Sequence, residues 1–564
     1  MSRVDLDFPG ILDWLEAPRA DRGVTLLDDE GRWRRTPYTE LAFRTRTMAA
    51  SLAEAGVTAG EVVSIVHRNG PGFVEVFFGA LALGAIPSPV VPPGLFQNKT
   101  SYEEHVSAIL DVAAPRAVVV EESMLHVLEP LVLARTGSPP LVPGRVPRTG
   151  PLAEIVAVDP ASTCLLQFTS GSSAAPKGVE VSRSALEAQL ELLGRWLGYG
   201  PDRGVSTWLP IHHDMGLVGN TLPSVVTGSD LQVMQPPQFI QGAARWLRVL
   251  GSGRFQITAV PPFALAHILR RVRARDLEGC DFSALEALVV GAEPIDPGLL
   301  DATAEFLAPF GLRREALLPA YGLAEATLAV TGKLPGIADE RVRVDRSRLR
   351  LGDKAVAETE ILADGSFLEL VSCGSALPGA EVSVHDEHGD PVEPGVLGEI
   401  VVGGRALADG YRGVTGARWK RFRTGDAGFV WNGGLYVVGR LGDGMKVRGV
   451  QVFAEDLESL IARSGALGVS RCTVLLGALD GRDTAAVLVV RAPGPWAEKV
   501  VRTLRSAVGA ARILVLSVTR DAMRRTSSGK PMRRAMFRDL ADGSIGGVTV
   551  YDSLTVTEGA GDDG

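Results

Sequence analysis

A loop of small hydroxyl and glycine residues between Cys164 and Gly178 (CLLQFTSGSSAAPKG) is the first segment that could do chemistry. Such a loop suits a phosphate group, because glycine lets backbone N–H groups come close while hydroxyls add hydrogen bonds. Lys177 would supply a positive charge. The spacing is not that of a Walker loop, since no hydroxyl residue follows this lysine. Taken alone, the segment fits a phosphate loop and an ordinary surface loop equally well.

Two adjacent histidines, His212 and His213, precede Asp214 in the segment WLPIHHDMGLVG. Adjacent side chains on a strand point to opposite faces, so the pair does not suit a single metal ion. A histidine beside a cleft could orient a carboxylate or a phosphate. A core histidine with satisfied hydrogen bonds is the more common alternative.

Two apolar runs that emerge into glycine turns, VVGAEPI and LPAYGLAEATLAVT, form a third group. The carboxyl ends of parallel strands meet at one edge of a sheet, so Glu293, Tyr321 and Glu325 are predicted to share a crevice. The tyrosine ring could stack on a base. Glu325 could hold Mg²⁺, which needs only one or two protein carboxylates besides substrate phosphates. A plain turn at the end of a strand is the alternative for each.

Two segments nearer the C-terminus complete the set of candidates. RTGDAGFVWNGGLYVVGR has Asp426 in a turn and Arg440 after a predicted hairpin. This aspartate could bind a ribose diol or form an Asx turn. RTSSGK places Lys530 after a hydroxyl-rich turn, which alone is typical of an exposed lysine.

The apolar pattern predicts the elements that would position these residues. Helices are expected over 38–56 and 72–84, and short strands over 61–67, 116–120, 204–209, 231–234, 256–260 and 287–291. This alternation predicts an α/β fold whose parallel sheets are covered by helices. Short β-type runs broken by Gly and Pro over 379–413 predict a β-rich subdomain, and the stretch after Gly439 predicts a separate C-terminal domain.

Composition limits the possible classes of protein. A chain of 564 residues suggests roughly three to four folding units. The net charge of −8 argues against a dedicated nucleic-acid binder. The most apolar run, 77–91, is too short to span a membrane, and the N-terminus lacks the pattern of a signal peptide. A reducing cytoplasm is favoured by the wide spacing of the cysteines, which are Cys164, Cys280, Cys373 and Cys472.

In this order, the candidate segments resemble the adenylate-forming superfamily of acyl-CoA synthetases, peptide-synthetase adenylation domains and luciferases. TSGSSAAPKG resembles that family's phosphate loop TSGSTGxPKG, while RTGD, GRLGDGMKVRG and TSSGK resemble its ribose, hinge and catalytic-lysine motifs. VVPPG, WLPIHHDMGLVG, GAEPI, YGLAEATLAVTG and LVSCGSALPG are most similar to fatty acyl-AMP ligases. Typical acyl-CoA synthetases have Thr where this chain has Ala324. The stretch 341–370 lies where these ligases have an inserted segment.

The resemblance implies a role for each matching residue. His213 would lie near the acyl carboxylate and the α-phosphate, Glu325 would hold Mg²⁺, and Lys530 would contact the reacting oxygens. Gly442 would be the hinge. The phosphate loop would comprise Thr169, Ser170, Gly171, Ser172 and Lys177. The remaining nucleotide contacts would be Gly291, Ala292, Glu293, Tyr321 and Gly322 around the base, with Asp426 and Arg440 at the ribose.

Several positions depart from the family pattern. In the phosphate loop and beside His213 they are Ser173, Ala174 and His212, which replace threonine, glycine and a common tyrosine. Val290 and Pro262 stand where asparagines are usual, and they are expected to flank the acyl pocket. These two changes favour an unusual natural-product acid over a plain straight-chain fatty acid.

The resulting interpretation is an ATP-dependent acyl-AMP ligase that passes its acyl group to the phosphopantetheine thiol of an acyl carrier protein. An acyl-CoA synthetase that uses free CoA is the alternative enzyme, and a silent nucleotide-binding homologue is the alternative of another class. The expected domains are 1–440, with a β-rich part at about 372–440, a hinge at 441–443, a C-terminal domain over 444–542 and a tail over 543–564. Neither a nucleic-acid partner nor a membrane span is expected.

Overall fold

The computed structural model describes residues 8–94, 99–143, 154–169, 176–346, 349–355, 367–447, 450–467, 472–525 and 531–555. Its largest sheet has nine strands in the order β16-β13-β12-β11-β10-β8-β9-β1-β2. The central strands run parallel, and they are β12 (Leu317–Gly322), β11 (Ala287–Val290), β10 (Ile257–Val260), β8 (Gly204–Thr207), β9 (Asp230–Val233) and β1 (Gly23–Leu27). Antiparallel strands close both edges, namely β13 (Ala329–Gly332), β16 (Ser375–Ala376) and β2 (Trp33–Pro37).

Helices pack against this sheet, and its central strands β10 and β11 are mostly apolar because both faces of the sheet are buried. All four residues of β10 and of β11 are buried. In α1 (Tyr38–Glu54), the buried Leu41, Thr45, Met48 and Leu52 recur at helical spacing. The other helices of this region are α2 (Pro71–Ala82), α5 (Arg183–Leu197), α6 (Asp214–Gly216), α7 (Leu222–Thr227), α8 (Pro236–Gln241), α9 (Ala243–Leu250), α10 (Pro262–Arg271) and α11 (Pro297–Leu307).

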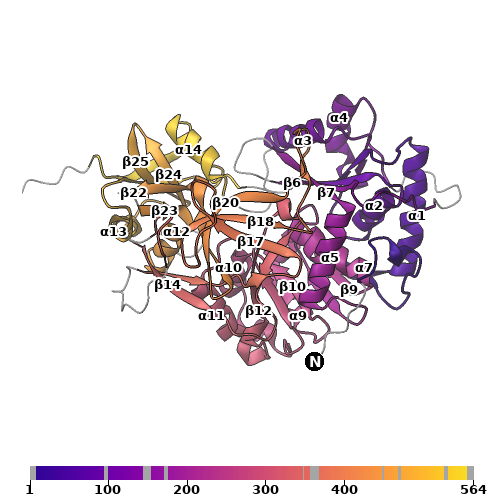
Figure 1. The fold of residues 1–564 in the computed structure, drawn as a ribbon, viewed down its shortest axis with the longest axis horizontal. Coiled ribbons are helices and arrows are strands. Elements are labelled where there is room, and N and C mark those ends of the chain that lie inside the picture. Colours follow the sequence, from indigo (N-terminus) through magenta and orange to yellow (C-terminus); the bar gives the residue numbers. More distant parts are fainter. Residues whose placement is uncertain are drawn as a thin grey trace, which may run out of the picture.

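A second α/β layer lies beside the first (Figure 1). It combines the parallel strands β4 (Ile86–Val90), β3 (Val62–Val66) and β5 (Ala117–Val120) with the antiparallel strands β6 (Thr163–Thr169), β7 (Lys177–Ser182) and β19 (Gly410–Tyr411). Its separate core includes residues of α3 (Lys99–Ala113) and α4 (Leu125–Thr136). The alternation of strands and helices predicted from the sequence is therefore confirmed.

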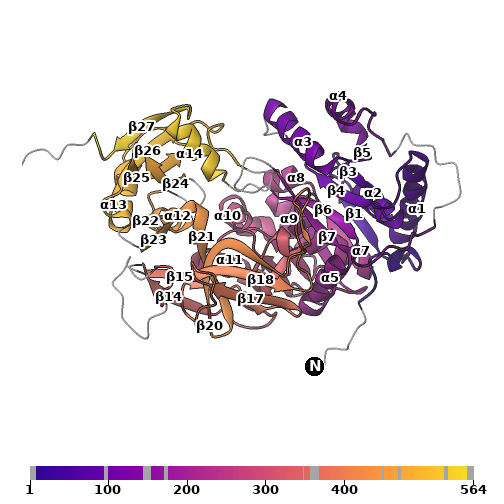
Figure 2. The same cartoon turned by 45° about the horizontal axis from the view of Figure 1, so that its top comes forward.

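A β-rich part follows in the chain, as predicted. It contains an antiparallel sheet in the order β17-β18-β20-β21, formed by β17 (Ala380–His385), β18 (Gly398–Gly404), β20 (Arg421–Trp431) and β21 (Gly434–Arg440). A hairpin of β14 (Arg341–Asp345) and β15 (Phe367–Val371) packs beside it. Figure 2 shows these strands between the large sheet and the C-terminal region.

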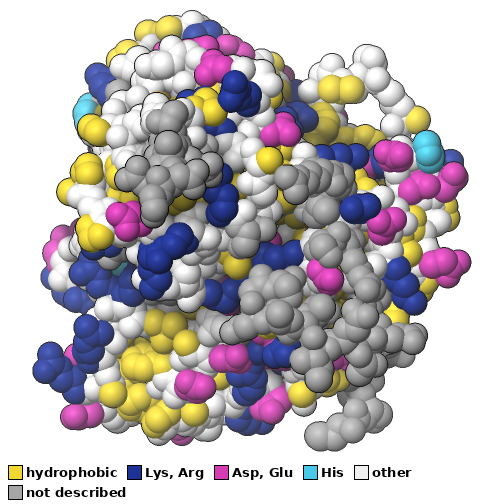
Figure 3. Space-filling view, turned by 90° about the vertical axis from the view of Figure 1, so that its left-hand side faces the viewer, with side chains coloured by type: hydrophobic (Ala, Val, Ile, Leu, Met, Phe, Trp, Pro, Cys, Tyr) yellow, Lys and Arg dark blue, Asp and Glu magenta, His cyan; other side chains and the backbone are white. Residues whose placement is uncertain are grey.

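The C-terminal region has its own hydrophobic core. Its sheet has the order β24-β25-β26-β27, formed by β24 (Cys472–Leu479), β25 (Arg482–Val489), β26 (Arg512–Val518) and β27 (Gly547–Asp552). The hairpin of β22 (Gly444–Val447) and β23 (Val450–Phe453) leads into it, and its helices are α12 (Ala454–Arg463), α13 (Trp496–Val508) and α14 (Arg533–Ala541). Lys and Arg side chains are spread over the face shown in Figure 3.

The C-terminal boundary expected at residue 542 is too early. Strand β27 lies within the expected tail, yet it pairs antiparallel with β26. The side chain of Arg512 bonds both carboxylate oxygens of Asp552, at 2.6 and 3.0 Å, which fixes the last strand. The first residues of β27 are exposed, so its apolar signal in the sequence is weak.

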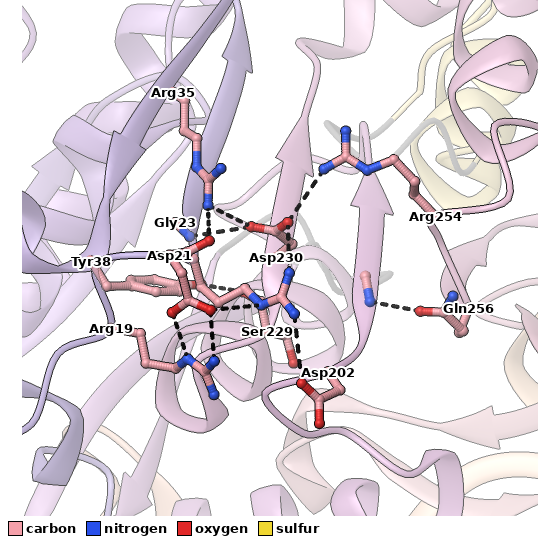
Figure 4. Close-up of polar contacts among 12 residues, drawn as sticks. Arg19, Asp21, Gly23, Arg35, Tyr38, Asp202, Ser229, Asp230, Arg254 and Gln256 are labelled. Carbon is pink, nitrogen blue, oxygen red and sulfur yellow. Dashed lines mark hydrogen bonds and ion pairs between the residues drawn. The ribbon is translucent and has the colours of Figure 1, made fainter.

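The two ends of the parallel strands differ in character. At the amino ends, Asp230 accepts hydrogen bonds from the Gly23 backbone and from Arg35, and Arg254 lies 3.4 Å away (Figure 4). Ion pairs of Asp230 with arginines therefore occupy the amino ends of these strands. The carboxyl ends carry the candidate residues. No helix in the part of the chain that the structure describes is long and apolar enough to cross a membrane.

Candidate functional site

The carboxyl ends of β11 and β12 bring the predicted base-binding residues to one edge of the large sheet. Val290 of β11 is paired with Pro319 of β12, so the turn that begins at Gly291 starts beside Tyr321. Ala292 has a φ of 69°, a left-handed conformation that is uncommon outside glycine. A Cβ on Gly291 would lie 3.1 Å from the Ala320 carbonyl oxygen, so the two strand ends approach closely. The ends of β11 and β12 therefore lie next to each other at this edge, while a crevice shared by Glu293, Tyr321 and Glu325 stays a prediction.

Asp426 joins this edge to the β-rich sheet. The Tyr321 hydroxyl donates to Asp426 Oδ2 at 2.7 Å, and Arg440 Nε donates to Asp426 Oδ1 at 3.2 Å. Asp426 and Arg440 are direct partners on β20 and β21. Burial and the neighbouring Asp426 carboxylate hold the pKa of Tyr321 well above its usual range, so the phenol remains a donor. Asp426 is thus hydrogen-bonded both to Arg440 of the neighbouring strand and to Tyr321, which lies 105 positions earlier in the chain.

Glu325 lies in the short 3₁₀ helix η7 (Ala324–Ala326), directly after β12. Its Oε1 accepts a 2.6 Å hydrogen bond from the hydroxyl of Tyr411 in β19. The Nζ atom of Lys177 lies 4.8 Å from the centroid of the same tyrosine ring. Among the described residues, no group of three or more His, Cys, Asp or Glu side chains could hold a metal. A metal here would depend on Glu325 together with oxygens from a ligand, a donor set that suits Mg²⁺.

The phosphate-loop prediction falls mainly outside the described residues. Ser170, Gly171 and Ser172 are not described, nor are the substituted Ser173 and Ala174. The two ends of the loop, Thr169 and Lys177, are paired across β6 and β7. The loop therefore leaves and re-enters one β-hairpin beside Tyr411.

His213 lies on a turn that two buried amides hold in place. Asn69 Nδ2 donates to the Leu209 carbonyl at 2.9 Å, while Asn69 Oδ1 accepts from the Ile211 backbone at 2.9 Å. Gln167 Nε2 donates to the His212 carbonyl at 2.8 Å. His213 occupies the N-cap position of α6 (Asp214–Gly216), without a side-chain capping hydrogen bond.

The other histidine of the pair, His212, is partly buried. Burial, reinforced by the charges of His213 and His105, holds the pKa of His212 well below its usual range. Its ring centroid lies 4.6 Å from that of His213. A positive charge on this ring is therefore disfavoured beside His213.

Sequence reasoning missed Asn69, Gln167 and Tyr411. Each acts through a contact with a residue far away in the chain, and none stands in a pattern of its own. The only available signal for Tyr411 was its place between Gly410 and Arg412 in a glycine-rich stretch, which marks a turn as readily as a site.

The expected hinge residue, Gly442, lies in η9 (Leu441–Asp443), immediately after β21. Gly442 does not have a positive φ, so its backbone conformation does not require glycine. A Cβ at this position would instead overlap the Arg534 guanidinium. The lack of a side chain makes room for Arg534.

A buried charge cluster joins the hinge region to α12 and α14. Arg533 donates to Glu455 at 2.8 Å and to Glu458 at 2.9 Å, and its guanidinium lies 3.7 Å from Asp443. Burial raises the pKa of Glu455 to about 7, although Arg533 opposes this shift. Lys530 lies outside the described residues, three positions before Arg533.

The segment 341–370 contacts the C-terminal region. Arg346 forms a buried ion pair with Asp456 of α12, and Arg346 Nε donates to the Phe367 carbonyl at 3.1 Å. The Gln451 backbone N–H donates to the Leu349 carbonyl at 2.7 Å. Residues 347–348 and 356–366 of this segment are not described.

The two substituted positions expected to flank the acyl pocket are both buried. Val290 ends β11 and has no exposed surface, and Pro262 begins α10. Val290 belongs to the hydrophobic core of the N-terminal region, so a change of side-chain volume there would alter the packing at the end of β11.

The model of the family described as AMP-binding enzyme matches residues 16–412, and the chain belongs to this family. The chain is 30% identical over 510 residues to the long-chain-fatty-acid–AMP ligase FadD26 of Mycobacterium marinum, covering 85% of each chain. It is 28% identical over 542 residues to the medium-chain-fatty-acid–[acyl-carrier-protein] ligase JamA of Moorena producens, covering 90% of each.

Solved structures agree with these relatives. A structure from a study of fatty acyl-adenylate ligases of E. coli and L. pneumophila superposes with a TM-score of 0.86 and 26% identity, covering 95% of this chain and 98% of that one. The McyG A-PCP structure with phenylalanyl-adenylate shares the fold, with a TM-score of 0.81 and 19% identity over 96% of this chain and 84% of that one. The predicted family, fold class and enzyme class, an ATP-dependent ligase that activates an acid, are confirmed.

Proposed function

We propose that this enzyme joins a carboxylic acid to AMP and then transfers the acyl group to the phosphopantetheine thiol of an acyl carrier protein. In the first step a carboxylate oxygen attacks the α-phosphorus of ATP, the bond to the β-phosphate breaks and pyrophosphate leaves. In the second step the sulfur attacks the acyl carbon, AMP leaves with the bonding electrons and the thiol proton is released. One observation carries this proposal: two groups of side chains from distant segments form after β12, with Asp426 bonded to Tyr321 and Arg440, and Tyr411 in contact with Glu325 and Lys177.

The nucleoside would lie over the ends of β11 and β12. Asp426 would accept hydrogen bonds from the ribose hydroxyls, because Tyr321 and Arg440 fix the orientation of its carboxylate. The turn from Gly291 to Glu293 would contact the base. Its left-handed Ala292 holds the backbone in one shape before the ligand arrives.

The triphosphate would lie between Lys177 and Glu325. Mg²⁺, bound by Glu325 and the phosphates, would neutralise charge on the phosphoryl oxygens. Lys177 would provide a second positive charge from the end of the loop. His213 would orient the acyl carboxylate, and Lys530 would stabilise the charge that develops on the reacting oxygens.

Three observations favour a carrier protein over free CoA. Ala324 and the segment 341–370 resemble the acyl-AMP ligases, and the relative JamA is named for an acyl-carrier-protein ligase. The ion pair between Arg346 and Asp456 ties that segment to the C-terminal region. The proposed domains are an N-terminal domain up to residue 440, a hinge at 441–443 and a C-terminal domain that would turn about this hinge between the two steps.

The substrate and the location are also proposals. Val290 and Pro262 support an unusual acid, since both replace the usual asparagines beside the expected acyl pocket. All four cysteines are free, as a reducing compartment would keep them. A cytoplasmic location stays a prediction.

Pyrophosphate release with ATP and a panel of acids tests the first step, with mass spectrometry to identify the acyl-AMP. A silent homologue would release no pyrophosphate with any acid. Single-turnover transfer from preformed acyl-AMP to equal concentrations of CoA and holo-carrier protein tests the second step. If CoA reacts as fast as the carrier protein, the enzyme is an acyl-CoA synthetase.

A further inference from the structure

Tyr411 stands between two residues of opposite charge that come from different sheets. Its hydroxyl donates to Glu325 Oε1 at 2.6 Å, and the Lys177 ammonium lies 4.8 Å from its ring centroid. Among the residues that the structure describes, Lys177 and Glu325 form no ion pair with each other. The tyrosine therefore separates an ammonium and a carboxylate that would otherwise attract each other.

The tyrosine ring is held on several sides. Trp419 packs edge-on at 4.8 Å between centroids, and Phe422 does so at 6.3 Å. The backbone of Tyr411 pairs with Val179 in β7, and the next residue, Arg412, donates its N–H to the Gly178 carbonyl at 2.8 Å. These contacts hold the tyrosine ring beside the end of the phosphate loop. They therefore fix the orientation of both its hydroxyl group and its ring plane.

The two parts of the Tyr411 side chain make different interactions. Its hydroxyl donates to Glu325, and a hydrogen bond from a phenol to a carboxylate is of the stronger, charge-assisted kind. The ring face attracts the lysine ammonium through a cation–π interaction.

We propose that Tyr411 is a positioning residue for the metal–nucleotide complex. Its hydroxyl orients the Glu325 carboxylate toward the cation, and its ring keeps the Lys177 ammonium beside the phosphate loop and apart from Glu325. The proposal rests on the proposed function, in which Glu325 holds Mg²⁺ and Lys177 contacts the phosphates. Under this proposal, metal binding depends on the hydroxyl of Tyr411, and phosphate binding depends on its ring.

The test measures binding of α,β-methylene-ATP to the full-length protein by calorimetry, with EDTA and with excess Mg²⁺. The ratio of the two dissociation constants is the metal coupling. Tyr411→Phe loses only the hydroxyl, so the coupling should fall about tenfold while metal-free affinity stays unchanged. Tyr411→Leu should also weaken metal-free binding, because the ring face that holds Lys177 is lost.

Two comparisons separate positioning from a general structural role. Glu325→Gln should lower the coupling, and adding Tyr411→Phe to it should cause no further loss, because the hydroxyl acts through that carboxylate. Tyr38→Phe is the matched control. Its buried hydroxyl donates to the Ser229 carbonyl at 2.7 Å at the opposite end of the strands (Figure 4), so the coupling should not change.

Several results would overturn the proposal for Tyr411. The coupling could be unchanged or stronger in Tyr411→Phe, or the double variant could lose clearly more than Glu325→Gln. If the wild-type protein binds the nucleotide with metal coupling and Tyr411→Phe does the same, only the role of Tyr411 fails. If the wild-type protein binds no nucleotide, the proposed function fails together with it.

Discussion

Arg346 and Asp456 form the contact whose loss should change the choice of acyl acceptor. Arg346 lies in the segment 341–370, whereas Asp456 lies in the first turn of α12. Their side chains are only 14% and 8% exposed, so solvent screens the pair weakly. Arg346→Met would leave the Asp456 carboxylate buried without this partner, and burial already raises its pKa. The arrangement of the two regions seen here would become less favourable.

The expected size of the effect on acceptor choice follows from the free energy that the ion pair of Arg346 with Asp456 can contribute. Removing one partner of a buried pair costs about 3–5 kcal/mol when the other charge stays buried. If the two regions separate about the proposed hinge, water reaches Asp456, and the cost is then that of a charge-assisted hydrogen bond, about 1.5–3 kcal/mol. The population of the arrangement seen here, relative to one in which the two regions have separated, should therefore fall by roughly 10- to 150-fold. The hydrogen bond from Gln451 to Leu349 would remain.

The assay is single-turnover transfer from preformed acyl-AMP to CoA and to holo-carrier protein. Arg346→Met should raise the CoA rate relative to the carrier-protein rate by about tenfold or more, while adenylate formation changes little. Arg343→Met is the control, because Arg343 lies on β14, is 66% exposed and faces Glu369 of the same hairpin at 3.8 Å. If the ratio of rates is the same in both variants, the contact does not select the acceptor.

Three further changes test other parts of the site. Lys530→Ala should lower adenylate formation by about 10²–10³ in single-turnover rate and affect transfer from supplied acyl-AMP much less; equal losses would give Lys530 another role. Gly442→Pro should impair one half-reaction and spare the other, and wild-type rates in both would place the hinge elsewhere. The raised pKa of Glu455 means that the folded protein holds this proton more tightly than the unfolded chain, so its contribution to stability is complete below about pH 4.5 and is lost as pH rises through about 7. Glu455→Gln should remove this part of the pH dependence of thermal unfolding, and an unaltered profile would contradict the assignment.

Much of the large sheet could be predicted because its strands are buried on both faces. Short, mostly apolar runs such as those ending at Val260 and Val290 are typical of strands buried on both faces. The meeting of Tyr321 with the turn after Val290 also followed, since parallel neighbours end at one edge. These conclusions needed only local pattern and a rule of sheet geometry.

Other features depend on contacts that no local pattern carries. Tyr411 reaches Glu325 across 86 positions of sequence, and Gln167 reaches the His212 carbonyl across 45. Strand β27 has too few buried residues to stand out, and it is held by the pair of Arg512 with Asp552. The reason for glycine at position 442 is that a side chain there would overlap the guanidinium of Arg534, which belongs to another helix. This reason cannot be read from the local sequence.

The buried pair of Arg346 and Asp456 also restricts how this enzyme can be recombined with its relatives. A chimaera that takes its C-terminal region from another ligase would keep Arg346 and replace α12. Unless the donor has a carboxylate at the matching position, the Arg346 guanidinium would keep its hydrogen bond to the Phe367 carbonyl but lose its buried charged partner. A crossover at the hinge alone is therefore less safe than an exchange of 341–370 together with the C-terminal region.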